Sequence, residues 1–239
     1  MQRVLHSEGY KRGLAKKKMV VREANQKKRV KWCQERRGRT LDNHWKKVIF
    51  SNESQIVLGT NNRVYIWRKE DEKYNPHLIC SRSERKISLM IWGCICYDGV
   101  GTLTAVEGNI NSAKYIDILD KNLRPVVVSY FEGKEYLFMD DNAPVHRSNT
   151  AENYKDQNEV TSMEWPAKSP DLSIIENIWL YKKRELQKSA VDITTKNDLL
   201  REIQNVWRNI ELDYMRNLYQ TIPDRLNDVI EMKGHLTKH

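Results

Sequence analysis

The chain has 239 residues, a length that suits one globular domain with an appendage and excludes a large multidomain assembly. Its 41 Lys and Arg residues exceed its 32 Asp and Glu residues, so the formal net charge is +9. No apolar run approaches the roughly 18 residues that a membrane-spanning helix needs, and no secretion signal opens the chain. We therefore expect an intracellular protein.

The positive charge is concentrated at the N-terminal end. Residues 1–47 hold sixteen Lys and Arg but only four Asp and Glu, a net charge of +12, whereas the rest of the chain carries −3. A basic arm ahead of a nearly neutral body favours a polyanionic partner such as nucleic acid. A solvated basic helix is the alternative that charge alone leaves open.

The cysteines do not indicate a disulfide framework, because four are too few and too scattered. Cys94 and Cys96 alternate along an expected strand and share one face. No second pair of Cys or His residues stands at zinc spacing, so we interpret these cysteines as reduced core residues.

The basic arm is expected to be helical. Residues 1–12 have the pattern of a helix end closed by Gly9, and we expect that helix to begin in a preceding part of a longer protein. Residues 22–37 show helical periodicity. On this helix the expected inward residues are Ala24, Val30, Trp32 and Cys33, and the expected outward residues are Lys27, Lys28 and Arg29.

Strands dominate after the arm. Residues 47–51 form a short β-branched and aromatic run, and residues 55–58 and 63–67 flank a GTNN turn that predicts a hairpin. Residues 68–86 are charged and irregular, which predicts a long loop of the kind that often serves function. A second hairpin is expected where residues 87–97 and 102–106 flank Asp98-Gly99.

Helices and strands alternate in the second half. The expected elements are a helix over 111–122 with Asn111 as its N-cap, an apolar strand over 136–140, a helix around 148–155, a short strand around 160–164, and helices over 174–188, 196–209 and 212–218. This order predicts an α/β fold, a mixed sheet flanked by helices, preceded by a basic helical arm.

Carboxylates that end strands or begin helices are candidates for chemistry. Metal-assisted phosphoryl transfer needs two or three of them at one point, where two Mg²⁺ ions about 3.5–4 Å apart clamp the reacting oxygens. The candidate positions are residues 51–54, residues 140–142 and Glu176. Because side chains alternate along a strand, only one of Asp140 and Asp141 can enter a site.

Structural interpretations of these residues stay open at this point. Alternation directs Glu53 away from a partner at Asn52. Glu176 follows Ser173 by three residues, the spacing of a capping box, and Asp171 is typical of a turn or cap. The Asp-Asn-Ala-Pro run after residue 140 is also an ordinary turn sequence.

Five segments resemble the catalytic core of Tc1/mariner-family transposases, of the Tc1-like branch. They are KKVIFSNES (46–54), RVYIWRK (63–69), LMIWGCICYDGVGTL (89–103), MDDNAPVHRS (139–148) and WPAKSPDLSIIENIWLYKKREL (165–186), in the family's order. Between Asp141 and Glu176 lie 34 residues, as in that branch's DD34E pattern.

The resemblance implies an RNase H-like fold with a metal-binding catalytic triad. Asp141 and Glu176 fall on its second and third members, and Asn52 falls on the first, where the family has aspartate. The three residues are thus the expected catalytic and metal ligands for two Mg²⁺ ions, with Mn²⁺ as a substitute. Because Mg²⁺ prefers a charged ligand to a neutral amide, we expect Asn52 to impair activity.

The resemblance also implies a division of the chain. Residues 1–45 correspond to a basic linker and the end of a truncated helix-turn-helix region, and residues 46–239 to the catalytic domain, with a clamp-type loop at 68–86. The residues expected to contact DNA are Lys16, Lys17, Lys18, Lys27, Lys28, Arg29, Arg36, Arg37, Arg39 and His146. For His146, a core or turn position is an equally open interpretation.

The resulting hypothesis is the catalytic portion of a cut-and-paste DNA transposase, acting in the nucleus. Its expected partners are double-stranded DNA, at transposon ends and a TA target, and a second copy of the chain on that DNA. A decayed or domesticated DNA-binding protein without chemistry is the alternative that Asn52 favours. An RNase H-like nuclease on RNA–DNA hybrids is opposed by the basic arm and by the segment SPDLSIIENIW.

Overall fold

The computed structural model of this protein describes residues 19–58, 87–188 and 193–239. Several expected segments lie outside these residues. They are the helix end at 1–12, the lysines at 16–18, the GTNN turn with the strand at 63–67, and the loop at 68–86. Among the described residues, no helix combines the length and the apolar composition that crossing a lipid bilayer requires.

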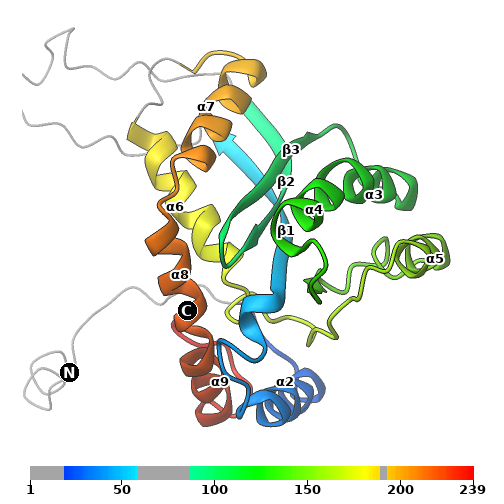
Figure 1. Ribbon diagram of the computed structural model, residues 1–239. Helices are drawn as coiled ribbons and strands as arrows, with labels where there is room; N and C mark the ends of the chain where they lie inside the picture. The colour runs from blue at the N-terminus through cyan, green and yellow to red at the C-terminus, as the bar shows by residue number, and fades with distance from the viewer. Residues whose placement is uncertain (1–18, 59–86, 189–192) are drawn as a thin grey trace, which may run out of the picture.

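Within the described residues, a four-stranded mixed sheet forms the centre of the molecule (Figure 1). In spatial order its strands are β3 (Gly99–Val106), β2 (Ile87–Cys96), β1 (Val48–Leu58) and β4 (Leu137–Met139). β1 pairs antiparallel with β2 and parallel with β4. The predicted hairpin at Asp98-Gly99 is confirmed, since β2 and β3 are antiparallel neighbours.

β1 is longer than the sequence predicted. We expected one strand over 47–51 and another over 55–58, because polar residues interrupt the apolar pattern between them. The structure has a single strand that pairs with β2 from Phe50 opposite Ile95 through Leu58 opposite Ile87. The long partner supplies backbone hydrogen bonds along the polar stretch, so tertiary pairing overrides the local pattern.

The strand expected around 160–164 is reduced to one bridge, between Phe138 and Ser162. β4 has only three residues, so it offers a neighbour little length to pair with. Two backbone hydrogen bonds of 2.8 Å remain, from the Phe138 N–H to the Thr161 carbonyl and from the Met163 N–H to the Phe138 carbonyl. This segment extends the edge of the sheet without forming a strand.

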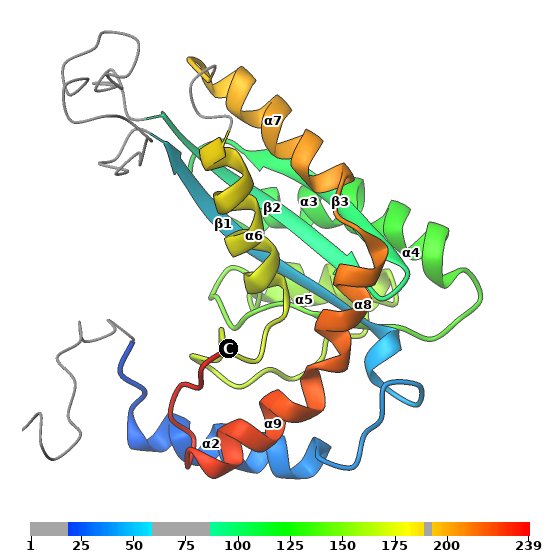
Figure 2. The same ribbon diagram turned by 90° about the vertical axis from the view of Figure 1, so that its left-hand side faces the viewer.

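Helices cover both faces of the sheet (Figures 1 and 2). One face carries α3 (Ser112–Ile118), a π-helical stretch (Leu119–Leu123), α4 (Arg124–Phe131) and α5 (Asn149–Gln157). The other carries α6 (Ile175–Lys188), α7 (Lys196–Arg208) and α8 (Leu212–Gln220). A short 3₁₀ turn, Trp45–Lys47, leads into β1, and α2 (Glu23–Arg36) packs against α9 (Ile222–Glu231).

Within the described residues, the helices predicted from sequence are present, and two further helices, α4 and α9, were not predicted. The Asn111 cap is confirmed, because its side chain accepts a hydrogen bond from the Lys114 N–H. α4 and α9 have no predicted counterpart, and each has a proline in its first turn. Proline is tolerated there because that position needs no N–H donor. The prolines therefore mark the starts of two helices that lie beyond the predicted helices over 111–122 and 212–218.

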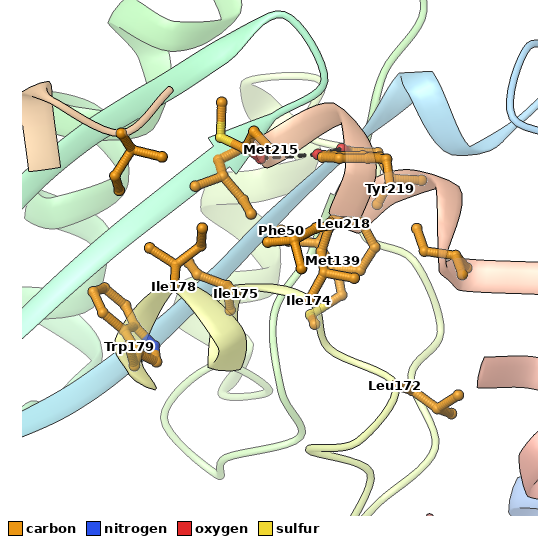
Figure 3. Close-up of a cluster of buried hydrophobic side chains, with 14 of the residues drawn as sticks. Phe50, Met139, Leu172, Ile174, Ile175, Ile178, Trp179, Met215, Leu218 and Tyr219 are labelled. Atoms are coloured by element: carbon orange, nitrogen blue, oxygen red, sulfur yellow. Dashed lines mark hydrogen bonds between the residues drawn. The ribbon is translucent and has the colours of Figure 1, made fainter. Parts of the chain in front are cut away.

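The side chains of the sheet divide the core into two clusters. Ile49 and Trp92 pack with the helices α3 to α5, and Phe50 and Ile91 pack with α6 to α9 and α2. Figure 3 shows the second cluster where the start of α6 and α8 meet the sheet, and the Tyr219 hydroxyl there donates a 2.8 Å hydrogen bond to the Val48 carbonyl. This packing fixes the start of α6 against β1.

The three described cysteines are buried and unpaired. Cys94 and Cys96 pack in the α3 to α5 cluster, as their alternation predicted, and Cys33 packs in the other cluster. Burial raises the pKa of Cys33 and Cys94 to about 12 and that of Cys96 to about 11. Cys80 lies outside the described residues.

α2 docks the described part of the basic arm on the body. Trp32 and Cys33 are buried, as the periodicity predicted, and the Trp32 Nε1–H donates a 2.7 Å hydrogen bond to the Glu164 carbonyl. Ala24 is exposed, contrary to prediction, whereas Arg29 is fully buried. The buried face of α2 is therefore rotated toward Arg29, which forms a buried ion pair with Asp171.

Candidate active site

Three separate elements bring Asn52, Asp141 and Glu176 to one cleft. Asn52 lies within β1, Asp141 follows β4, and Glu176 is in the first turn of α6. The parallel strands β1 and β4 are neighbours, and the Ser51 Oγ–H donates a 2.9 Å hydrogen bond to the Met139 carbonyl across them. All three side chains line a cleft of about 440 Å³, whose walls include residues 142–144 and 165–170.

Asn52 and Glu176 are in direct contact. The Asn52 Nδ2–H donates a 2.7 Å hydrogen bond to Glu176 Oε1. The capping interpretation of Glu176 requires the Ser173 hydroxyl to accept from the helix, but Ser173 Oγ has no hydrogen-bond partner among the described residues. Instead the Glu176 N–H donates to the Ser173 carbonyl, at 3.2 Å. The glutamate side chain thus turns toward the cleft and away from its own helix end.

The environment of Glu176 disfavours its charge. Burial raises the pKa of the Glu176 carboxyl above its usual range, while Lys183 and the Asn52 hydrogen bond lower it and the Asp141 charge raises it further. Asp141 and Glu176 face the same cleft, so their negative charges repel each other. A cation in the cleft would offset the cost of burying the Glu176 charge and would reduce its repulsion from Asp141.

Asp140 and Asp141 point to opposite sides, as their alternation predicted. The Asp140 carboxylate is buried and accepts hydrogen bonds from Lys155 Nζ at 2.7 Å, the Tyr115 hydroxyl at 2.7 Å and Arg147 Nη2 at 2.9 Å. These partners satisfy its charge, so Asp140 has a structural role. Asp141 has a side chain that is 55 % exposed and lines the cleft.

Asp141 is held by His146 and by a backbone N–H. His146 Nδ1 lies 2.9 Å from Asp141 Oδ1, and the Ala143 N–H donates to the same oxygen at 2.8 Å. The hydrogen bond from His146 is the main cause that lowers the pKa of Asp141. The carboxylate is therefore charged and oriented at neutral pH.

His146 does not occupy the position that was predicted for a DNA contact. Its side chain is 3 % exposed, it stacks on Tyr115 with ring centroids 4.1 Å apart, and its Nε2 lies 3.2 Å from Glu53 Oε1. Burial alone would lower the pKa of His146, but the hydrogen bonds with Asp141 and Glu53 raise it to about 10. The imidazolium thus bridges two carboxylates, and no face of it is open to a phosphate.

Glu53 lies on the opposite side of β1 from Asn52, as predicted from alternation. Its carboxylate pairs with His146, and it is absent from the residues that line the cleft. Glu53 therefore supports Asp141 indirectly, through the shared imidazolium. Sequence reasoning missed this link, because nothing local connects residue 53 with residue 146.

Arg29 is wrongly predicted as a DNA contact, because its side chain is fully buried. Its guanidinium donates two hydrogen bonds to the Asp171 carboxylate, Nη1 to Oδ1 at 2.9 Å and Nη2 to Oδ2 at 2.7 Å. Its remaining donors reach the carbonyls of Lys168, Gly234 and His235. Asp171 also accepts from the Thr237 N–H at 2.9 Å, so this ion pair joins α2, the loop before α6 and the C-terminal segment.

The other basic residues of the arm divide into two groups. Lys27, Lys28, Arg37 and Arg39 are exposed, although Lys27 pairs with Glu23 at 2.8 Å. Arg36 is buried, with its guanidinium 4.5 Å from the centre of the Trp32 ring, so it is not placed to bind DNA as predicted. Lys16 to Lys18 lie outside the described residues.

The oxygen atoms that line the cleft suit a hard divalent cation, but only two of the three candidate ligands, Asp141 and Glu176, can carry negative charge. Carboxylate and amide oxygens are the ligands that Mg²⁺ and Mn²⁺ accept. Among the described residues, no group of three or more His, Cys, Asp and Glu side chains is arranged to hold a metal ion. At this cleft the described side chains supply two carboxylates, from Asp141 and Glu176, and one neutral amide, from Asn52.

Comparison with known proteins places this arrangement in a family. A model of the DDE superfamily endonucleases matches residues 47–199, which include all three cleft residues. The Tcb1 transposase of Caenorhabditis briggsae is 30 % identical over 93 % of this chain and 81 % of its own length. This protein belongs to the DDE superfamily endonucleases, among the Tc1/mariner transposases. The Tc1 transposase of Caenorhabditis elegans is 27 % identical over the same shares of the two chains.

Solved structures show that the DDE fold of this chain is RNase H-like. A paired-end complex of the Mos1 transposase with its left transposon end matches 98 % of this chain and 69 % of its own, with a TM-score of 0.79 at 14 % identity. The isolated catalytic domain of the Mos1 mariner transposase matches 93 % of this chain, with a TM-score of 0.69. Other Mos1 paired-end complexes contain Mg or Mn.

Proposed function

We propose that this chain is the catalytic portion of a cut-and-paste DNA transposase in which Asn52 impairs DNA cleavage. The observation that carries the proposal is the convergence of Asn52, Asp141 and Glu176 on one cleft, with an amide at the first position of the triad. Membership of the DDE endonucleases supports the reaction class, and the transposases among its relatives support transposition as the context.

The proposed cofactor is a divalent cation, Mg²⁺ with Mn²⁺ as a substitute, held by the oxygens of Asn52, Asp141 and Glu176. When bound, such an ion activates water or a DNA 3′-hydroxyl and neutralises charge on the attacked phosphate. The chain prepares this site by holding Asp141 through His146 and Glu176 through Asn52. With a neutral third ligand, we expect one ion to bind weakly and a second hardly at all.

The proposed partner is double-stranded DNA, at transposon ends and at a TA target, bound by a homodimer in the nucleus. The exposed cations of the arm, Lys27, Lys28, Arg37 and Arg39, supply sequence-independent attraction to phosphates. We retain the division into an arm over 1–45 and a catalytic domain over 46–239 that includes a clamp-type loop at 68–86.

A second candidate function is a DNA-binding protein without chemistry. Asn52 favours it, because losing one charge-stabilising group costs about 3–4 kcal/mol at a transition state, roughly a thousandfold in rate. Both candidate functions include DNA binding. They differ in whether the cleft cuts once its third carboxylate is restored.

Nicking of a supercoiled plasmid in Mn²⁺ tests the proposal without a specific transposon end. The chain is compared with Asn52→Asp, and with Asn52→Asp combined with Glu176→Gln as the matched control. We expect the single variant to nick at least about a thousandfold faster than the parent, and the double variant to be inactive. Equal nicking by the parent and Asn52→Asp would show that Asn52 does not impair the site. An inactive Asn52→Asp that binds DNA and Mn²⁺ would favour the second candidate.

A further inference from the structure

The backbone of Lys168 is in an unusual conformation. Its φ of 59° lies in the left-handed region, which costs energy for a residue with a Cβ atom. Among the described residues other than glycine, Glu159 and Lys233 also have positive φ, and each closes the end of a helix, α5 and α9 respectively. Lys168 follows no helix, so helix closure does not account for it.

Arg29 holds the loop in this conformation. The Arg29 Nη1–H donates a 3.0 Å hydrogen bond to the Lys168 carbonyl, and the same guanidinium pairs with Asp171 three residues later. In Figure 2 the C-terminal segment runs from α9 toward the loop that leads into α6, where Thr237 joins the same carboxylate. A fully buried ion pair thus fixes both the carbonyl of Lys168 and the side chain of Asp171 in the same loop.

The side chain of Lys168 is exposed and lines the same cleft as Asn52, Asp141 and Glu176. Within the described part of the chain, no carboxylate lies within ion-pair distance of its ammonium, although two face the cleft. The cation that lowers the pKa of Glu176 is Lys183. Other described lysines are paired with carboxylates, among them Lys27, Lys31, Lys46, Lys47, Lys121, Lys155 and Lys238.

Backbone strain is retained where the surrounding structure enforces it, and such residues cluster at functional sites. Glycine or asparagine would adopt the conformation of Lys168 at lower cost. What lysine adds is a compact positive charge on a long flexible stem, which suits a phosphate oxygen. Three observations therefore point to an anionic ligand: the position at the wall of the cleft, the enforced backbone, and an ammonium with no carboxylate partner among the described residues.

We propose that Lys168 binds a phosphate of the DNA strand that enters the cleft, and that Arg29 is a positioning residue that acts through the Lys168 carbonyl. The inference rests on the proposed function, because it takes DNA as the ligand. It adds a contact at the chemical site to the contacts of the arm. Arg29 was predicted from sequence to contact DNA itself. In this proposal it positions Lys168, and Lys168 contacts the DNA.

The test exploits the left-handed backbone. Lys168→Gly removes the ammonium and also relieves the strain, so we expect an unchanged or higher Tm together with weaker DNA binding. Affinity for a short duplex DNA is measured over a range of salt concentrations. Loss of one phosphate contact should make the log–log slope shallower by about 0.9. Lys168→Arg, which keeps the charge, should keep the slope.

Lys233→Gly is the matched control. It makes the same substitution at an exposed lysine with the same backbone conformation, outside the cleft, and we expect no change of slope. An unchanged slope in Lys168→Gly, an equal loss in both glycine variants, or a lower Tm in Lys168→Gly would each overturn the inference. If the parent chain itself shows no salt-dependent binding to duplex DNA, the proposed function fails instead.

Discussion

The amide of Asn52 donates a 2.7 Å hydrogen bond to the carboxylate of Glu176, joining β1 to the first turn of α6. An aspartate at residue 52 would place two carboxylates at this separation with no hydrogen between them. Two carboxylates this close do not both ionise readily unless a cation joins them. The amide therefore stabilises a metal-free cleft and removes one of the charges that would attract a metal ion.

Asn52→Asp is expected to make folding depend on metal. Without metal, loss of the hydrogen bond and the new repulsion should lower the free energy of unfolding by about 1–3 kcal/mol. Mn²⁺ at a hundredfold excess over its Kd should restore about 2.7 kcal/mol. Denaturant unfolding with EDTA and with Mn²⁺ measures both values. Asn52→Ala, which loses the bond without adding charge, should gain nothing from Mn²⁺, and an Asn52→Asp variant as stable as the parent in EDTA would contradict the geometry.

Glu176→Gln is expected to remove the response to metal and to stabilise the metal-free protein at neutral pH. Burial raises the pKa of Glu176 above 4.5 in the folded protein, so the stability from its protonated form is full below pH 4.5 and is lost as the pH rises through the folded pKa. Gln avoids that loss and can still accept from Asn52. Thermal unfolding between pH 4 and 7 should show the two proteins converging at the acidic end, whereas retained Mn²⁺ stabilisation in the variant would refute Glu176 as a ligand.

His146→Gln is expected to lower stability most below pH 6.5. The folded pKa of about 10 exceeds the unfolded value of 6.5, so the contribution of the imidazolium is full below pH 6.5 and declines as the pH rises toward 10. Removing the cation between Asp141 and Glu53 should cost about 3–5 kcal/mol there. Unfolding across pH 6–10 should show the difference from the parent shrinking. His235→Gln, at an exposed histidine, serves as the control, and a constant difference would argue against the bridge.

Arg29 and Lys28 are neighbours with opposite expected roles. Arg29→Met leaves the buried Asp171 carboxylate without its partner, so the free energy of unfolding should fall by about 3–5 kcal/mol. Lys28→Met should change it by less than about 0.5 kcal/mol but should reduce the salt slope of DNA binding by about 0.9. Denaturant unfolding and salt titration of both variants test the pair. A stable Arg29→Met with a reduced slope would return Arg29 to the DNA surface.

The meeting of Asn52, Asp141 and Glu176 at one cleft was predictable from sequence, because the signals for these residues are local or lie in a fixed order along the chain. Asp141 follows an apolar strand, and the SPDL segment places Glu176 at a helix start. The burial of Arg29 was not predictable, because its partners are Asp171 and the backbone at residues 234 and 235, far along the chain. Lysine and arginine look equally solvated on a helical wheel until such a partner is known.

The continuity of β1 shows the same limit in the fold. Its polar residues 51–54 include Asn52 of the cleft, and they interrupt the apolar pattern by which a strand is recognised. Only the pairing with β2, residues 87–96, shows that the strand continues. The bridge from Glu53 to His146 likewise depends on the pairing of β1 with β4, which brings together two segments that no short-range pattern connects.

The rate at which the buried cysteines are alkylated would report how often the surrounding structure opens. With pKa values of about 11 to 12, their thiols are almost entirely protonated at neutral pH and are enclosed, so alkylation must wait for the protein to open. Cys33 lies in the cluster that includes α2, and Cys94 and Cys96 lie on the other side of the sheet. In a Cys80→Ser background, equal labelling rates would mean that the domain opens as one unit. Faster labelling of Cys33 would show that α2 separates from the loop of Lys168 and Asp171 before the rest of the domain unfolds.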